Sequence, residues 1–339
     1  MEQKDLITVN KKNKHMTLNF TSKIPKVSII IPSHNRIDSL KELLDSILET
    51  MEHVCPFEVI VVCDGCVDGS EEMVKKVAQK HPEIKCIAKK GEGPAKARNV
   101  GVRSSRGDII AFTDDDCLVT KEWLKQIVEH FDKTEAVGLQ GRTSTDRKSC
   151  TPLTHQIDNE HGSDAFPTCN VAIKKDAFWQ VGGFDESFPY AHNEDADLAW
   201  RLEKIGKLLF VPSMQVIHPP RKEKLSKLMK RMEILESEFL LYYKDKDAYK
   251  SKRATNPWVN IYGKMFFKHI PLSLKSRIKY MNRPVVFAQG VLINLSWWAS
   301  LIYLFPKFRQ ADKRYKALVK NTKAKKSGVG QLIPKVIRR

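Results

Sequence analysis

Residues 108–116 read Asp108-Ile109-Ile110-Ala111-Phe112-Thr113-Asp114-Asp115-Asp116. The apolar run at 109–112 is typical of a buried strand, and it leads directly into three adjacent carboxylates. Such carboxylates repel one another unless protons or a cation neutralise them. Hard divalent cations such as Mg²⁺ take oxygen ligands and commonly bridge carboxylates to substrate phosphates. The stretch indicates either a metal site or an acidic loop or helix N-terminus, where aspartate is common.

Strands and helices are predicted to alternate on both sides of this stretch. β-branched runs predict strands, and apolar residues at helical spacing predict the helices between them. This pattern predicts an α/β fold with a doubly wound, mostly parallel sheet, in which ligands bind at the carboxyl ends of strands. Pro32, Asp64 and the acidic triplet fall at such ends. Predicted strands are 27–32, 57–62, 84–88, 108–113, 208–211 and 216–218, and predicted helices are 37–51, 70–80, 94–102, 121–131 and 195–206.

The net charge of +18 is unevenly distributed. Residues 1–220 hold 29 Lys and Arg against 33 Asp and Glu, a net of −4, whereas residues 221–339 hold 29 against 7, a net of +22. We therefore expect a catalytic domain at 26–220 and a basic, largely helical region at 221–339 that meets an anionic surface, either lipid headgroups or nucleic acid. The polar residues 1–25 are predicted to be a flexible lead-in.

Residues 285–305 contain no charged side chain and have the length of a membrane span. They include Gln289 and Asn294, however, and basic residues flank both ends, whereas a simple span carries its positive charge on the cytoplasmic side. We therefore favour a re-entrant or interfacial element over a true span or a buried core helix. Seven cysteines without framework spacing, and no recognisable signal peptide, favour a cytoplasmic location at the inner face of the cell membrane.

Motifs in the first half of the chain resemble those of the family 2 glycosyltransferases with the GT-A fold. Residues 27–36 are similar to the opening strand and turn, 61–70 to V-D-D-G-S-x-D-G-T, 93–101 to G-x-x-x-A-R-N-x-G, and 114–116 to the D-x-D position. Cys63 and Cys66 replace the usual Asp and Ser; they also match C-x-x-C, but no second pair supports a zinc or redox site. The resemblance implies that Asp116 binds the metal and that the following residues contact the donor nucleotide: Pro32, His34, Arg36, Asp64, Arg98, Asp114 and Asp115.

The resemblance continues through residues 170–175, 182–186 and 193–202, similar to N-x-A-x-R-R, G-G-F-D-E and E-D-x-D-L-x-x-R-L. It implies that Asp195 is the general base with Glu194 beside it, and that His218 completes the metal site. We expect Asn170 and Trp200 to contact the sugar or the acceptor. Taken alone, residues 193–202 also fit an N-capped helix with an i,i+4 pair between Asp197 and Arg201.

The expected activity is inverting, metal-dependent transfer of a sugar from a nucleotide-diphosphate sugar, by default a UDP-sugar. The expected cofactor is Mn²⁺ or Mg²⁺, and the expected acceptor is a hydroxyl of a glycan or lipid-linked glycan, in polysaccharide or cell-envelope biosynthesis. A sugar-phosphate nucleotidyltransferase is the alternative enzyme, but residues 32–36 lack the glycine-rich loop that it would need. A non-enzymatic protein binding anionic polymers through 221–339 is the other alternative. It has no recognition-helix or RNP signature, and we expect no nucleic-acid partner.

Overall fold

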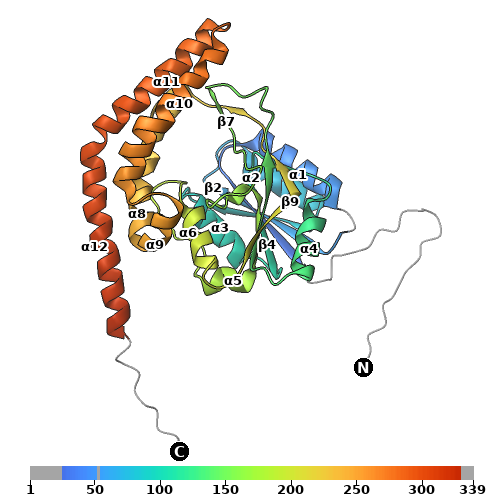
Figure 1. Ribbon diagram of the computed structural model, residues 1–339. Coiled ribbons are helices and arrows are strands. Elements are labelled where there is room, and N and C mark those ends of the chain that lie inside the picture. Colours follow the sequence, from blue (N-terminus) through green and yellow to red (C-terminus); the bar gives the residue numbers. More distant parts are fainter. Residues whose placement is uncertain (1–24, 52–53, 330–339) are drawn as a thin grey trace, which may run out of the picture.

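The computed structural model describes residues 25–51 and 54–329, so the predicted lead-in lies almost wholly outside the described residues. An α/β body is followed by a helical region that stands beside it (Figure 1). In the body the elements are β1 (Val27–Ser33), α1 (Ile37–Met51), β2 (Phe57–Asp64), α2 (Ser70–Lys80), β3 (Ile84–Lys89), α3 (Pro94–Arg103), β4 (Ile109–Phe112), β5 (Leu118–Val119), α4 (Trp123–Lys133), β6 (Gly138–Ser144), β7 (Thr154–His155), η2 (Thr168–Asn170), β8 (Val171–Lys174), α5 (Lys175–Gln180), α6 (Glu194–Leu202) and β9 (Leu208–Ile217).

Eight strands form one sheet in the order β3-β2-β1-β4-β8-β6-β9-β5. The pairs β3–β2, β2–β1, β1–β4 and β6–β9 are parallel, which confirms the predicted mostly parallel sheet. β8 is antiparallel to both of its neighbours, and β5 is antiparallel to β9. The parallel half carries the carboxyl ends of β1, β2 and β4 at one edge, where the predicted donor residues lie.

The two short strands predicted at 208–211 and 216–218 are one strand, β9, paired with β6. The pairing shifts register between Gly141 and Arg142, so that Val211 and Gln215 face consecutive residues of β6. The intervening bulge accommodates Pro212, which has no N–H to donate to a ladder. The predicted helix at 195–206 ends earlier, at Leu202.

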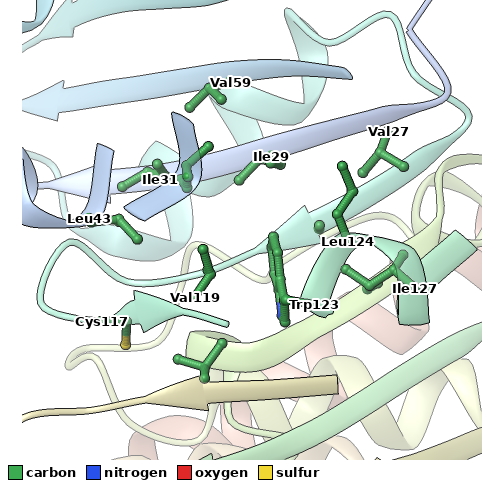
Figure 2. Packing of buried hydrophobic residues seen from close by; sticks show 14 of the residues in the cluster. Val27, Ile29, Ile31, Leu43, Val59, Cys117, Val119, Trp123, Leu124 and Ile127 are labelled. Atoms are coloured by element: carbon green, nitrogen blue, oxygen red, sulfur yellow. The ribbon is translucent and has the colours of Figure 1, made fainter. Parts of the chain in front are cut away.

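Both faces of the sheet are covered, which explains the continuous apolar runs of its strands. Ile29 and Ile31 of β1 pack on one face in a cluster that includes Leu43 of α1 and Trp123 of α4 (Figure 2). Ile30 points to the opposite face and belongs to a cluster with residues of α3 and α6. Every residue of β1 is therefore buried.

The helical region has its own apolar cluster, which includes Phe239, Ile270, Leu301 and Phe308. Within the described residues, α11 is the helix long and apolar enough to cross a membrane, although 22% of its most apolar window is buried against the protein. The elements after β9 are β10 (Arg221–Lys222), α7 (Leu225–Met229), η3 (Arg231–Glu236), α8 (Ser237–Lys244), α9 (Lys246–Lys252), η4 (Val259–His269), α10 (Ile270–Ser276), η5 (Arg277–Tyr280), α11 (Pro284–Tyr303) and α12 (Phe305–Val329).

Candidate functional site

A cleft of about 540 Å³ opens at the carboxyl edge of the parallel strands. Its lining brings together eleven of the thirteen site residues predicted from the sequence, drawn from segments that span residues 32 to 218. They are Pro32, His34, Arg36, Asp64, Arg98, Asp114, Asp115, Asp116, Glu194, Asp195 and His218. The lining also includes residues that the sequence did not single out, among them His155, Thr168 and Arg221.

Each carboxylate of the acidic triplet has an arginine partner. Asp114 Oδ1 lies 2.8 Å from Arg98 Nη2, and Asp115 Oδ1 lies 2.5 Å from Arg36 Nη1. Asp116 Oδ2 lies 3.0 Å from Arg36 Nη1 and 3.0 Å from Arg221 Nη1. Burial raises the pKa of Asp115 to about 6, and Arg36 opposes that rise. The guanidinium groups therefore neutralise part of the negative charge of the triplet, which reduces the mutual repulsion expected from the sequence.

Asp116 and His218 also meet, with 3.6 Å between Asp116 Oδ1 and His218 Nε2. A ligand atom of Cys117 lies within 4.8 Å of both, and all three residues are buried. The pKa of the Cys117 thiol is raised well above its ordinary value by a hydrogen bond with Cys169 and by burial, so the sulfur stays protonated at neutral pH and is a poor ligand. A carboxylate oxygen and an imidazole nitrogen fit Mn²⁺ or Mg²⁺ better than a thiol does.

Asp64 holds the loop that follows β3. Its carboxylate accepts hydrogen bonds from the backbone N–H of Glu92 at 3.0 Å and of Gly93 at 2.7 Å, and Lys89 Nζ lies 3.0 Å away. The next residue, Gly65, has φ 76°, and a Cβ there would lie 2.8 Å from the backbone nitrogen of Gly91. The Asp-Gly turn therefore brings two loops together at the cleft, and the predicted base contact of Asp64 stays a prediction.

At the other side of the cleft, Asp195 Oδ2 accepts hydrogen bonds from Thr168, while Oδ1 is buried without a hydrogen-bond partner among the described residues. Burial raises the pKa of Asp195, and Arg98 lowers it. Burial and the neighbouring Asp195 raise the pKa of Glu194 to about 8. Glu194 Oε1 lies 3.4 Å from Arg98 Nη1, so one guanidinium serves Asp114 and Glu194 together.

The start of α6 partly matches the alternative of an N-capped helix with an ion pair between Asp197 and Arg201. The predicted pair is confirmed, with Arg201 Nη2 at 2.6 Å from Asp197 Oδ2. The side chain of Asn193, however, makes no capping bond; its backbone is left-handed, with φ 74°, and its amide donates to Glu238 Oε1 at 2.9 Å. The left-handed residue directs the chain so that Glu194 and Asp195 enter the cleft in the first turn of the helix.

The prediction that Asn170 and Trp200 contact the sugar or the acceptor does not match their positions. Asn170 is 1% exposed, accepts a hydrogen bond from Trp123 Nε1 at 2.8 Å, and donates to the carbonyl oxygens of Arg142 and Met214, both at 2.9 Å. Trp200 is 2% exposed and packs edge-to-face on Tyr249. Neither lines the cleft. The side chain of Asn170 is enclosed by α4, β6 and β9, and the ring of Trp200 packs against α9 of the helical region.

The part of the fold that holds Asp64 and the acidic triplet corresponds to a known domain family. Residues 28–185 match the model named Glycosyl transferase family 2. Residues 28–185 therefore form a glycosyltransferase family 2 domain. Proteins with similar sequences are named as glycosyltransferases. Glycosyltransferase AglE of Haloferax volcanii is 26% identical over 214 residues, which cover 59% of this chain and 69% of AglE.

Validoxylamine A glucosyltransferase of Streptomyces hygroscopicus subsp. jinggangensis is 26% identical over 225 residues, covering 55% of this chain but only 53% of that protein. Among solved structures, mannosyltransferase PcManGT from Pyrobaculum calidifontis, determined with GDP-Man and Mn²⁺, superposes with a TM-score of 0.55 at 18% identity, over 88% of this chain and 87% of that one. TarS 1-349 of S. aureus, determined with UDP-GlcNAc, superposes with a TM-score of 0.52 at 17% identity, over 88% of this chain and 92% of that one. These likenesses confirm the predicted GT-A fold.

Proposed function

We propose that this family 2 glycosyltransferase transfers a sugar from a nucleotide-diphosphate sugar to an acceptor hydroxyl, with inversion and with a divalent cation. The observation that carries the proposal is the pairing, in one cleft, of the Asp116–His218 cluster with a buried carboxylate, Asp195, that keeps one oxygen without a partner among the described residues. The related folds of PcManGT, solved with GDP-Man and Mn²⁺, and TarS, solved with UDP-GlcNAc, support a nucleotide-sugar donor and a cation.

The proposed reaction is a single displacement. Asp195 takes the proton of the acceptor hydroxyl, and the acceptor oxygen forms a bond to the anomeric carbon on the face opposite the diphosphate. The bond from that carbon to the diphosphate oxygen breaks, and its electron pair leaves with the nucleoside diphosphate. Because attack and departure occur on opposite faces, the anomeric configuration inverts. A cation held by Asp116 and His218 would supply positive charge against the leaving diphosphate.

The test is a screen of nucleotide sugars, UDP-sugars first, for transfer or slow hydrolysis with Mn²⁺, followed by Asp195→Asn. General-base catalysis contributes about 10²–10⁴-fold, so the variant should lose transfer while it still binds nucleoside diphosphate. Asp176→Asn, an exposed aspartate of α5, is the matched control. Near-normal transfer by Asp195→Asn, or full transfer after chelation by EDTA, would contradict the proposal. Anomeric NMR of the product decides between inversion and retention.

We further propose that the acceptor is a glycan carried on a lipid and that the helical region attaches to the anionic inner face of the cell membrane. The region exposes large apolar side chains, including Phe267, Ile278, Met281 and Val285, between basic residues. From 251 to 320 the single acidic residue is Asp312, which already accepts hydrogen bonds from Tyr243 and Trp258. Cations beside apolar side chains are typical of an interfacial surface.

A polar contact within the apolar stretch of α11 favours an interfacial helix over a span, although most of the helix is not buried. Ile293 and Asn294 are fully buried, and Asn294 Oδ1 accepts a hydrogen bond from Arg277 Nε at 2.9 Å. Sedimentation with phosphatidylcholine vesicles, with and without phosphatidylglycerol, tests the attachment. Met281→Glu with Val285→Glu should abolish binding to the anionic vesicles, whereas Ile205→Glu in the body should not. Equal binding of the wild type, the double variant and Ile205→Glu would contradict the proposed membrane-binding surface.

A further inference from the structure

Arg221 sits on a small ribbon outside the main sheet. It begins β10, whose pairing is with β7, and its direct partner across the two strands is His155. Both residues line the cleft. The ribbon therefore places the guanidinium group of Arg221 beside the acidic triplet, and the ribbon is separate from the eight-stranded sheet.

The guanidinium of Arg221 shares a carboxylate oxygen with a second arginine. Asp116 Oδ2 lies 3.0 Å from Arg221 Nη1 and 3.0 Å from Arg36 Nη1. Arg36 has another carboxylate in the cleft, since the same Nη1 lies 2.5 Å from Asp115 Oδ1. The second partner of Arg221 is Glu223 Oε1, at 2.5 Å, on the segment that follows the ribbon. Arg221 therefore has one anchor in the cleft and one outside it.

Asp116 cannot hold two guanidinium groups and a divalent cation at once. At 4 Å, two unit charges of like sign repel by about 1 kcal/mol in water and about 4 kcal/mol near a protein surface, and a divalent ion doubles the effect. One arginine must therefore move away when a cation binds Asp116. Arg36 keeps Asp115, so the one displaced is Arg221. The donor brings a diphosphate into the same cleft, which is the natural new partner for a guanidinium group.

We propose that Arg221 is a built-in counter-ion of Asp116 which a divalent cation displaces and which then binds the diphosphate of the donor. The proposal rests on the proposed function, because it needs both a cation and a nucleoside diphosphate in this cleft. It has a thermodynamic consequence. Arg221 opposes cation binding when no nucleotide is bound and strengthens nucleotide binding once the cation is present, so the two ligands bind cooperatively.

The experiment measures two affinities in the full chain. Binding of Mn²⁺ alone is followed by electron paramagnetic resonance, and binding of UDP and GDP at saturating Mn²⁺ is followed by calorimetry. Arg221→Gln should bind Mn²⁺ several-fold more tightly than the wild type. It should bind the nucleoside diphosphate about 10- to 100-fold more weakly, the effect of losing one charge-assisted hydrogen bond. Arg221→Lys should restore most of the nucleotide affinity.

The opposite signs separate this role from a structural one, because damage to the ribbon would weaken both ligands. Lys222→Gln, the exposed neighbour on β10, should change neither affinity, and thermal melting shows that each variant is folded. Weaker Mn²⁺ binding by Arg221→Gln, or unchanged affinities for both ligands, overturns the proposal. A wild-type chain that binds neither Mn²⁺ nor either nucleotide overturns the proposed function along with it, so the two failures are distinguishable.

Discussion

Thr168 donates two hydrogen bonds to one oxygen of Asp195: its backbone N–H and its hydroxyl both lie 3.1 Å from Asp195 Oδ2. The two donors fix the orientation of the carboxylate and leave Oδ1 as the oxygen available to take a proton. They also stabilise the charged form, which holds down a pKa that burial raises. Thr168 thus controls both the geometry and the ionisation of the proposed base.

Thr168→Val should move the acid limb of the activity profile to higher pH. The variant loses the hydroxyl donor, so the pKa of Asp195 rises further, and a base must be ionised to accept a proton. We expect a shift of about one pH unit, which corresponds to about 1.4 kcal/mol. The measurement is kcat/KM for the donor against pH. Thr134→Val removes a hydroxyl that bonds to His130, outside the cleft lining, and is the control. A limb that stays in place or moves to lower pH would contradict the assignment.

Glu194→Gln should retain activity at neutral pH. Because burial and Asp195 raise the pKa of Glu194 to about 8, the side chain is mainly protonated at pH 7, and glutamine resembles that neutral form. We expect less than about a tenfold loss in kcat, against the about 10²–10⁴-fold expected for Asp195→Asn. Steady-state rates of the two variants at pH 7 decide which carboxylate is the base. If Glu194→Gln is as inactive as Asp195→Asn, the proton is not taken by Asp195 alone.

Asn170→Ala should destabilise the fold and should not act through substrate binding. Its amide satisfies the Trp123 indole N–H and two backbone carbonyl groups. Each buried polar group left without a partner costs about 1–3 kcal/mol, so we expect a loss of about 3 kcal/mol or more. Urea unfolding followed by circular dichroism measures it. Asn282→Ala, at an exposed position, is the control. A stable variant with a raised KM for the donor would instead support the ligand contact predicted from the sequence.

Glu58→Gln should lower the free energy of unfolding at neutral pH. It should also make that free energy depend less on pH in the acid range. Glu58 is 1% exposed and accepts hydrogen bonds from Ser28, Lys85 and the backbone of Arg106, which lower its pKa against the effect of burial.

A carboxylate with a lowered folded-state pKa stabilises the fold above its unfolded pKa, and this stability is lost as pH falls through the folded pKa. The substitution weakens hydrogen bonds to a charged group, each of which contributes about 1.5–3 kcal/mol, while Lys85 and Arg106 stay partly exposed to water. Unfolding free energies between pH 3 and 7 for Glu58→Gln and for exposed Glu42→Gln test this. Parallel curves for the wild type and Glu58→Gln would show that Glu58 makes no such contribution.

The sequence by itself determined the architecture of the parallel part of the sheet, β1 to β4. Apolar runs such as 57–62 identify strands buried on both faces, and in a parallel sheet their carboxyl ends meet at one edge. That reasoning placed Asp64 and the acidic triplet in one cleft, because strand position and turn chemistry are local properties of the chain. The same local reasoning divided β9 at Pro212, since a bulge that keeps one strand continuous depends on its partner β6.

Only the tertiary structure decided what each polar side chain does. Asn170 lies in a motif that suggested ligand contact, yet its amide is enclosed by Trp123 and by backbone from two strands. Thr168 and Arg221 gave no signal in the sequence, because their partners Asp195 and Asp116 are distant along the chain. Hydrogen bonds and ion pairs depend on distances of a few ångströms between such segments, and no local pattern of residues encodes those distances.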